Sequence, residues 1–320
     1  IPWGMCFLPN EDLLVSDRNV TLWQIEKDGK SKKKILGVPK VKYKGQGGLL
    51  DVQIHPNFID NNLVYICFSD FLPKDKNKSF TSIVQAKLKN NKLLNVKTIY
   101  KADDKFYTKS NVHYGSRLAF DNNNHLYFSI GDRGNRDQAQ LLTTPNGKIH
   151  RLNDDGSIPK DNPFLKIPDA QKSIWTYGNR NPQGLVIDKK TSSIFSAEHG
   201  PRGGDELNVI EKGKNYGWPE ITYGINYIGT KITKYTHKEG MEQPITHWTP
   251  SIAVCGIDFY DNNIFTNWQN SLFVTSLKFE NLYRLEIESG KVIKQELIFS
   301  TGSRVRDVET GPDGFIYIAI

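Results

Sequence analysis

The sequence predicts an all-β protein, a six-bladed β-propeller with four antiparallel strands in each blade. Three observations support this fold class. One hairpin pattern recurs six times along the 320 residues, short strand patterns lie between the copies, and no long segment has a helical period. A β-sandwich is the alternative architecture, but six copies of one hairpin favour radial repetition. We therefore expect a single propeller domain over residues 1–320.

Each copy of the hairpin pattern has two runs of β-branched, leucine and aromatic residues, joined by a turn of Pro, Asn, Asp or Gly. The copies begin at Pro2, Gly47, His113, Asn181, Ala253 and Ser303. Strand patterns at 21–25, 82–88 and 282–287 lie in the intervals and supply further strands. The last copy reaches Ile320 before its blade is complete, so the closing of the first and last blades is left open.

Hairpin geometry gathers the polar residues of these copies on one face. The start of the first strand and the end of the second lie together, opposite the turn. Because equivalent strands of all blades run in the same direction, these ends surround the axis. The residues expected there are Gln46, His113, Arg180, Asn181, Arg304 and Arg306 from strand starts, and Asp17, Asp70, Asp132, Glu198 and Lys278 from strand ends. The sequence therefore predicts a site at one mouth of the propeller.

The composition argues against two kinds of partner. The chain carries 42 Lys and Arg against 35 Asp and Glu, a net charge of +7, with lysines concentrated at 27–44 and 74–78. Neither run has interleaved aromatic residues or a nucleic-acid motif, so we interpret both as solvated loops and expect no nucleic acid. No stretch approaches the roughly 18 consecutive apolar residues of a membrane span, so no transmembrane segment is expected.

Several motifs that would indicate other chemistry are absent. There is no GxxxxGK[ST] loop, HExxH pair, GxSxG elbow or EF-hand loop, and no GxGxxG follows a predicted strand. These absences argue against phosphate-loop, zinc-protease, serine-hydrolase and nicotinamide chemistry. Cys6, Cys67 and Cys255 lie in apolar strand-like runs without CxxC spacing, so we predict buried free thiols.

An imidazole and a carboxylate occupy the two open ends of one predicted hairpin. His113 precedes its first strand and Asp132 follows its second. Proximity of the two groups suits a general base whose protonated form is stabilised by the acid.

Basic residues should converge on the same mouth. Arg180, Lys278, Arg304 and Arg306 would repel one another there unless an anion or a neighbouring Asp or Glu neutralised them. Arg117 and Arg133 fall in the same glycine-rich motifs. Taken together, these side chains indicate a polycarboxylate or phosphorylated ligand.

The run AEHGPRGGDELNVIEKGKNYGWP from Ala197 contains candidate oxygen ligands for hard cations. Irregular Gly-Pro loops expose main-chain carbonyls, which Ca²⁺ accepts as ligands. Gly200 and Pro201 are candidates for one ion. Glu206 and Tyr216 are candidates for a second.

These motifs resemble the soluble quinoprotein glucose and aldose sugar dehydrogenase family. The matching stretches are QGGLLDVQIHPNF, HYGSRLAF, IGDRGNRDQAQ, YGNRNPQGL, the run from Ala197, SLK and SRVRD, in the family's order over nearly the whole chain. GGDELN and YGINY resemble the aldose branch most closely. The resemblance implies an enzyme that oxidises aldose sugars to lactones with pyrroloquinoline quinone (PQQ) and calcium. It also implies an external electron acceptor, a periplasmic or secreted location, and a monomer or homodimer.

Residue by residue, the resemblance implies that His113 takes the proton of the anomeric hydroxyl while hydride passes to the quinone. Asp132 would orient His113, and Arg180 would stabilise charge on the reduced cofactor. The cofactor-binding positions are Gln46, Arg180, Asn181, Tyr227, Lys278, Arg304 and Arg306. Gly200 and Pro201 match the catalytic calcium site, and Glu206 and Tyr216 match a structural one. Asp137 departs from the family pattern, because glucose-oxidising relatives carry a glutamine there, so the preferred sugar is not implied.

Two other functions are compatible with such a propeller. A noncatalytic binding module would be favoured by loss of His113 or of the basic cluster, and both are present. A calcium-dependent sugar lactonase would place carboxylates and asparagines around an axial metal, where this sequence offers arginines and a lysine.

Overall fold

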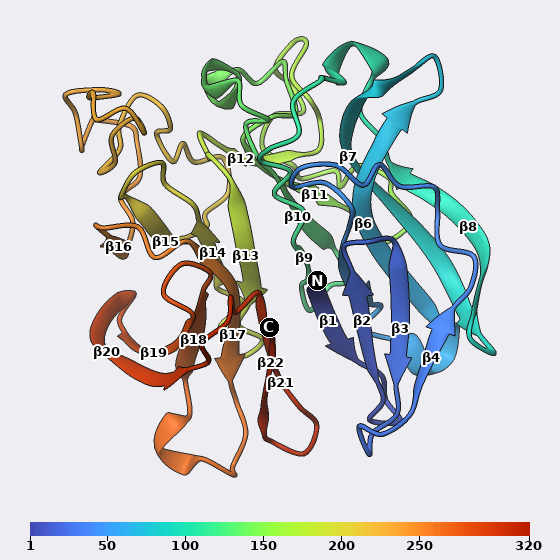
Figure 1. Cartoon of the computed structure of the whole chain (residues 1–320). Coiled ribbons are helices and arrows are strands. Elements are labelled where there is room, and N and C mark those ends of the chain that lie inside the picture. The colour runs from blue at the N-terminus through green and yellow to red at the C-terminus, as the bar shows by residue number, and fades with distance from the viewer.

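The structure, a computed structural model that describes residues 1–320, arranges antiparallel sheets around a central axis (Figure 1). The first blade contains β1 (Pro2–Phe7), β2 (Leu13–Asp17), β3 (Thr21–Ile25) and β4 (Lys32–Ile35). The second contains β5 (Leu49–Ile54), β6 (Leu63–Leu72), β7 (Asp75–Lys89) and β8 (Lys92–Tyr100). The third contains β9 (Leu118–Phe120), β10 (Leu126–Ile130), β11 (Lys148–Leu152) and β12 (Ile174–Tyr177).

The remaining strands form two further blades and a smaller sheet. The fourth blade contains β13 (Pro182–Ile187), β14 (Ile194–Glu198), β15 (Asp205–Val209) and β16 (Thr246–Trp248). The fifth contains β17 (Val254–Tyr260), β18 (Ser271–Ser276), β19 (Asn281–Glu288) and β20 (Lys291–Ser300). β21 (Asp307–Thr310) and β22 (Ile316–Ala319) pair only with each other. Helical turns are short: α1 (Phe58–Asn61), η1 (Asp104–Phe106), η2 (Arg136–Gln140) and η3 (Thr266–Trp268).

The prediction of six four-stranded blades is wrong, because the structure has five. The sixth copy of the hairpin pattern forms a sheet of two strands, which lies between the fifth and first blades with β21 in contact with β17 and β1. The repeat pattern identified a hairpin, and a hairpin supplies only two strands. The segment from Ser303 to Ile320 contains no further strand that could extend this sheet. The first blade does have all four strands.

The core consists of apolar layers between successive sheets. Leu14 and Leu22 of the first blade pack with Val52 and Val64 of the second, for example, and all four are buried. Comparable layers lie between the second and third, third and fourth, and fourth and fifth blades. Alternating apolar residues on neighbouring sheets produce this packing, since each strand directs every second side chain to the same face.

The inner strands approach the axis closely and are joined there by buried charges. Arg117 donates to Asp51 (3.1 Å) of the second blade and to Asp307 (2.9 Å) of the two-stranded sheet. A Cβ atom at Gly4 would lie 2.2 Å from the Asp51 carboxylate, so only glycine allows β1 to pass this group. Arg117 therefore stabilises the centre of the propeller.

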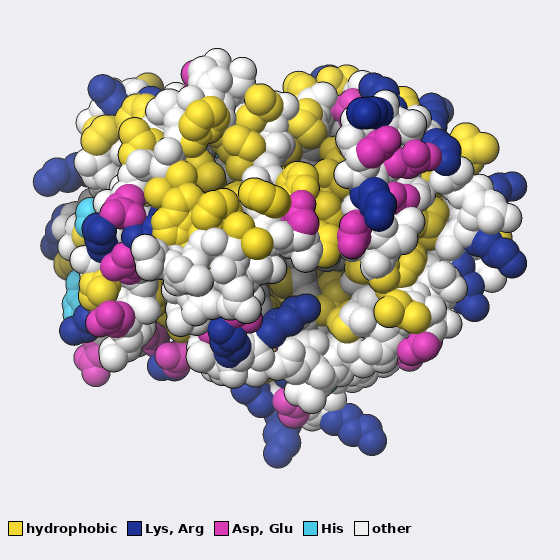
Figure 2. All heavy atoms as spheres, turned by 90° about the horizontal axis from the view of Figure 1, so that it is seen from below, with side chains coloured by type: hydrophobic (Ala, Val, Ile, Leu, Met, Phe, Trp, Pro, Cys, Tyr) yellow, Lys and Arg dark blue, Asp and Glu magenta, His cyan; other side chains and the backbone are white.

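The two ends of the propeller differ in chemistry. Turns of the β1–β2, β17–β18 and β21–β22 hairpins lie at the lower end in Figure 1. Figure 2 shows that end, where hydrophobic, basic and acidic side chains surround a central hollow. The open ends of the hairpins lie at the opposite end, as the sequence predicts.

The three cysteines are buried free thiols, which confirms the prediction from sequence. The single α-helix spans four residues, and no helix is long and apolar enough to cross a membrane.

Candidate active site

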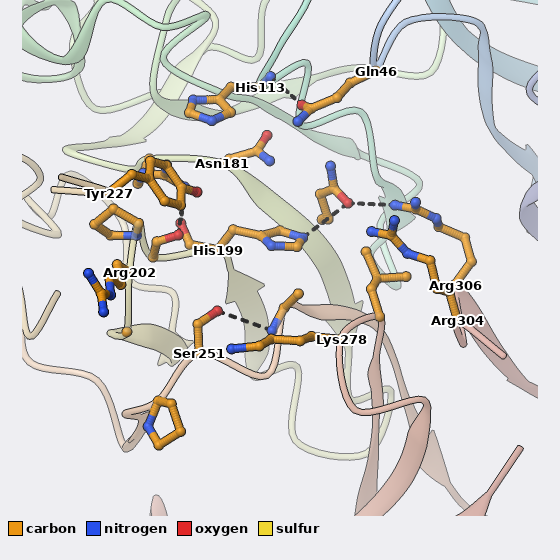
Figure 3. A pocket seen from close by; sticks show the side chains of 18 of the residues that line it. Gln46, His113, Asn181, His199, Arg202, Tyr227, Ser251, Lys278, Arg304 and Arg306 are labelled. Carbon is orange, nitrogen blue, oxygen red and sulfur yellow. Dashed lines mark hydrogen bonds between the residues drawn. The ribbon is translucent and has the colours of Figure 1, made fainter. Parts of the chain in front are cut away.

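A cavity of about 1220 Å³ lies where the hairpins open. It brings together residues predicted from all parts of the chain: Gln46, His113, Arg180, Asn181, Gly200, Pro201, Tyr227, Lys278, Arg304 and Arg306. Most of them lie just before the first strand of a hairpin or just after its second. In Figure 3 His113 and Gln46 lie on one side of the cavity, Lys278 lies opposite, and Arg304 and Arg306 come from the segment before β21.

His113 and Asp132 form a close pair at the cavity wall. Nδ1 of His113 lies 2.6 Å from Oδ1 of Asp132, which is buried behind the imidazole. The backbone of His113 has a left-handed φ of 53°, and its amide donates 2.7 Å to Oε1 of Gln46 (Figure 3). Left-handed backbone is uncommon for a residue with a side chain and occurs often at functional sites. Because Nδ1 faces the carboxylate, Nε2 is the nitrogen available to a ligand.

The surroundings keep this imidazole neutral and this carboxylate ionised. Burial lowers the pKa of His113 and the charge of Arg180 lowers it further, so the pKa falls below 6.5 although Asp132 opposes the change. Burial acts to raise the pKa of Asp132, but the hydrogen bond and charge of His113 and the Gly134 amide outweigh it and lower the pKa overall. Both shifts favour a neutral base beside an ionised acid.

The cavity is lined by six cationic side chains and no Asp or Glu side chain. The cationic residues are Arg18, Arg180, Arg202, Lys278, Arg304 and Arg306, and none of them forms a salt bridge. The Nε atoms of Arg180 and Arg306 are buried without a hydrogen-bond partner. Cations that share one cavity without a carboxylate repel one another, so this lining favours an anionic ligand with several acceptor oxygens.

His199 and Gln183, which sequence reasoning missed, connect the basic residues. Oε1 of Gln183 accepts a hydrogen bond from Nη1 of Arg306 (2.9 Å) and lies 3.2 Å from Nε2 of His199 (Figure 3). Burial and the nearby charges of Arg180 and Arg306 lower the pKa of His199 well below 6.5. His199 directly precedes Gly200 in the quoted run, but only the fold brings it next to Gln183.

The loop of Gly200 and Pro201 is fixed by hydrogen bonds on both sides. The Gly200 amide donates to Asp205 (2.8 Å), and its carbonyl accepts from Nη1 of Arg180 (2.8 Å). A Cβ atom at Gly200 would lie 2.2 Å from the Gly204 carbonyl, so no side chain fits. Of the two lone pairs of the Gly200 carbonyl, one faces Arg180 and one remains for another partner.

Glu206 and Tyr216 lie outside this cavity, and Glu206 belongs to a second cluster of oxygen atoms. Nδ2 of Asn208 lies 3.2 Å from the Glu206 carboxylate and 3.4 Å from that of buried Glu198. Asn179 also donates to Glu198 (3.2 Å). The Oδ1 atoms of both asparagines are buried without a partner, and the Tyr216 carbonyl accepts no hydrogen bond.

The two carboxylates of this cluster have perturbed acidities. Burial raises the pKa of Glu198 to about 7. Burial and the charge of Glu198 raise the pKa of Glu206 to about 8. Because unpaired acceptor oxygens surround two carboxylates that resist ionisation, the cluster suits a bound cation.

Some residues predicted at the mouth have other roles. Asp17 accepts from the Asn19 amide (3.3 Å), and Asp70 accepts from Tyr107 (2.7 Å). Arg117 forms an axial cluster with Asp51 and Asp307, and buried Arg133 donates to the Ser110 carbonyl (2.6 Å) beneath the His113 loop. Arg117 and Arg133 therefore stabilise the scaffold and do not line the cavity. Asp137 is exposed in η2, outside the lining.

Known proteins share this sequence and this fold over nearly the whole chain. The family described as glucose/sorbosone dehydrogenase matches residues 1–320. The chain is 40% identical to aldose sugar dehydrogenase YliI of Escherichia coli, over 99% of this chain and 86% of that protein. The apo crystal structure of the soluble E. coli aldose sugar dehydrogenase superposes with a TM-score of 0.94 at 39% identity, over 99% of this chain and 92% of that one. The PQQ-bound aldose sugar dehydrogenase of Streptomyces coelicolor superposes with a TM-score of 0.80 at 28% identity, over 96% and 84%.

Proposed function

The chain belongs to the glucose/sorbosone dehydrogenase family and is a sugar-oxidising enzyme, and from this premise we propose that it oxidises aldoses at the anomeric carbon with PQQ. The product would be a lactone, and the electrons would pass to an external acceptor. The cavity would hold the cofactor, with the sugar next to His113.

The lining of the cavity carries this proposal. PQQ is a flat tricarboxylate, and six cationic side chains with no carboxylate among them complement such an anion. Gln183 holds Nη1 of Arg306 and the Gly200 carbonyl holds Nη1 of Arg180, so both guanidinium groups are fixed at the cavity wall. A cavity of about 1220 Å³ has room for the cofactor and a sugar. We propose that Gln46, Arg180, Asn181, Tyr227, Lys278, Arg304 and Arg306 contact the cofactor.

His113 would act as the general base. Nε2 would accept the proton of the anomeric hydroxyl, and Asp132 would stabilise the imidazolium through Nδ1. Arg180 lies beside the pair and would stabilise negative charge on the cofactor. PQQ, when bound, supplies the two-electron acceptor that this chemistry needs.

Calcium would occupy two places. Carbonyls of Gly200 and Pro201 would hold one ion at the cavity wall, where it would act as a Lewis acid. Glu206 and the Tyr216 carbonyl would hold the second, and the unpartnered oxygens of Asn179 and Asn208, with Glu198, extend that ligand set. No three His, Cys, Asp or Glu side chains are arranged as a metal site, so carbonyl and amide oxygens would have to complete each shell.

The remaining features of the proposal rest on the relatives. A periplasmic or secreted location and a monomeric or homodimeric state would fit this family. Reconstitution tests the function directly: purified protein is supplied with PQQ and calcium, and reduction of an artificial dye is followed with a panel of aldoses. We expect reduction only when both additions and an aldose are present. No cofactor-dependent reduction with any aldose would reject the proposal, and lactone cleavage without the quinone would replace it.

A further inference from the structure

Trp218 lies behind the His113–Asp132 pair and touches the carboxylate from the far side. Its indole N–H donates 2.9 Å to Oδ2 of Asp132, a buried contact. The other oxygen, Oδ1, lies 2.6 Å from Nδ1 of His113 and accepts from the Gly134 amide at 2.8 Å. One carboxylate oxygen thus contacts the imidazole, and the other accepts the hydrogen bond of the indole.

The backbone of Trp218 is held in place by contacts that do not involve Asp132. Trp218 is buried, its amide donates to the Gly178 carbonyl (2.8 Å), and its carbonyl accepts from Nε2 of Gln140 (2.7 Å). Gln140 and Asn215 also exchange side-chain hydrogen bonds of 3.0 and 2.8 Å. A buried indole on this fixed backbone has little freedom to turn, so it presents its N–H to the carboxylate from one direction.

The charges around this group are mostly positive. The guanidinium carbon of Arg180 lies 5.3 Å from the centre of the Trp218 ring, and that of Arg136 lies 5.8 Å from it. The charge of Arg133 also acts on His113 and lowers its pKa, whereas the lowered pKa of His199 keeps that imidazole neutral. Asp132 is the acid that offsets them at His113. Its orientation therefore determines which nitrogen of the imidazole carries the proton.

We propose that Trp218 is a positioning residue for the general base. Its N–H fixes the rotation of the Asp132 carboxylate, which directs Oδ1 to Nδ1 of His113 and leaves Nε2 unprotonated toward the substrate. This inference rests on the proposed role of His113. Removal of the N–H leaves Asp132 with one donor fewer, so its charge becomes more available to the imidazolium. The pKa of His113 should then rise.

A pair of tryptophan variants tests the inference. Trp218→Phe removes the donor and keeps an aromatic ring. Trp175→Phe is the matched control, because Trp175 is equally buried and its indole nitrogen has no hydrogen-bond partner. The primary readout is the pKa of His113 by NMR titration of the protein without cofactor. The second is the pH profile of turnover after reconstitution.

In Trp218→Phe we expect a higher His113 pKa. Turnover should therefore be lost at a higher pH on acidification than in the wild type. We also expect kcat to fall about tenfold with KM unchanged, the loss of one hydrogen bond to a charged group. Trp175→Phe should leave all three quantities unchanged. A purely structural role would lower thermal stability without moving the His113 pKa. An unchanged His113 pKa in folded Trp218→Phe would overturn the inference.

A second measurement applies if Trp218→Phe does not fold. Asp132→Asn removes the charged acceptor, so one indole N–H resonance among the six tryptophans should shift strongly. If none shifts, the inference is wrong. Lack of dehydrogenase activity in the wild-type protein would contradict the proposed function instead. The NMR results need no cofactor, so the two failures can be distinguished.

Discussion

Nδ1 of His113 lies 2.6 Å from Oδ1 of Asp132, because His113 precedes β9 and Asp132 follows β10, and the antiparallel hairpin brings these two ends together. This contact turns a histidine at the cavity wall into a base with a defined tautomer. The indole of Trp218 supports it from behind, and the cationic lining faces it across the cavity.

Replacement of His113 by Ala should abolish turnover and leave quinone binding nearly intact. The side chain moves a proton but adds no charge to the cofactor contacts, so kcat should fall by about 10²- to 10⁴-fold. Steady-state dye reduction and quinone titration measure the two effects separately. A variant that loses binding to the same extent as turnover would contradict this assignment.

The pH dependence of turnover should follow from the lowered pKa of His113. A base must be neutral to accept a proton, and burial together with Arg180 keeps the imidazole neutral below pH 6.5. Activity should therefore be lost on acidification only below pH 6.5. In Asp132→Asn the carboxylate charge that raises the His113 pKa is absent. The loss of activity on acidification should therefore move to a lower pH, and kcat should fall. Loss of activity at a higher pH in this variant than in the wild type would contradict this assignment.

Calcium should stabilise the protein more at high pH than at low pH. In the calcium-free protein the pKa of Glu206 is raised from 4.5 to about 8, so this group opposes folding increasingly as the pH rises across that range. Calcium would bind the ionised form and remove this cost. The rise in Tm on calcium addition should be larger at about pH 9 than at about pH 5.

Glu206→Gln should abolish most of that pH-dependent rise in Tm. Glu211→Gln is the control, because Glu211 is exposed and is not among the expected ligands. Equal calcium responses in wild type, Glu206→Gln and Glu211→Gln would remove the second cation site from the account.

Arg117→Met should destabilise the propeller strongly. It leaves the buried carboxylates of Asp51 and Asp307 without their shared partner, and breaking a buried ion pair costs about 3–5 kcal/mol. Urea unfolding measures the loss. Lys291→Met, at an exposed position, should change stability by less than about 0.5 kcal/mol. Similar values for the two variants would show that the axial cluster contributes little.

The sequence predicted the hairpins and their common orientation because both depend on local patterns. Alternating apolar residues and turn residues repeat with each copy, and strand direction follows from that order. The number of complete blades could not be predicted from the repeat. The copy at Ser303 has the same hairpin signature as the others, but its sheet has only two strands. Outer strands such as β4 and β20 are largely exposed, so no clear alternation of apolar and polar residues marks them.

Residues that line the cavity could be predicted where they lie beside a strand end of the repeat. Gln46, His113 and Arg306 are of this kind. Trp218 could not be found this way, because it lies in an irregular segment and reaches Asp132 only through the fold. Glu198 was expected at the mouth, but its carboxylate turns toward Asn179 and Asn208 instead.

Titration of the quinone into wild-type protein and Arg306→Ala, followed by its absorbance, tests the central claim most directly. Nη1 of Arg306 is held by Gln183, and the guanidinium lines the cavity without a carboxylate to neutralise it. Loss of a charged hydrogen bond should weaken binding about 10- to 100-fold, with His113→Ala binding as tightly as wild type. Equal affinity of wild type and Arg306→Ala, or no binding by the wild type, would contradict a cavity built for a tricarboxylate cofactor.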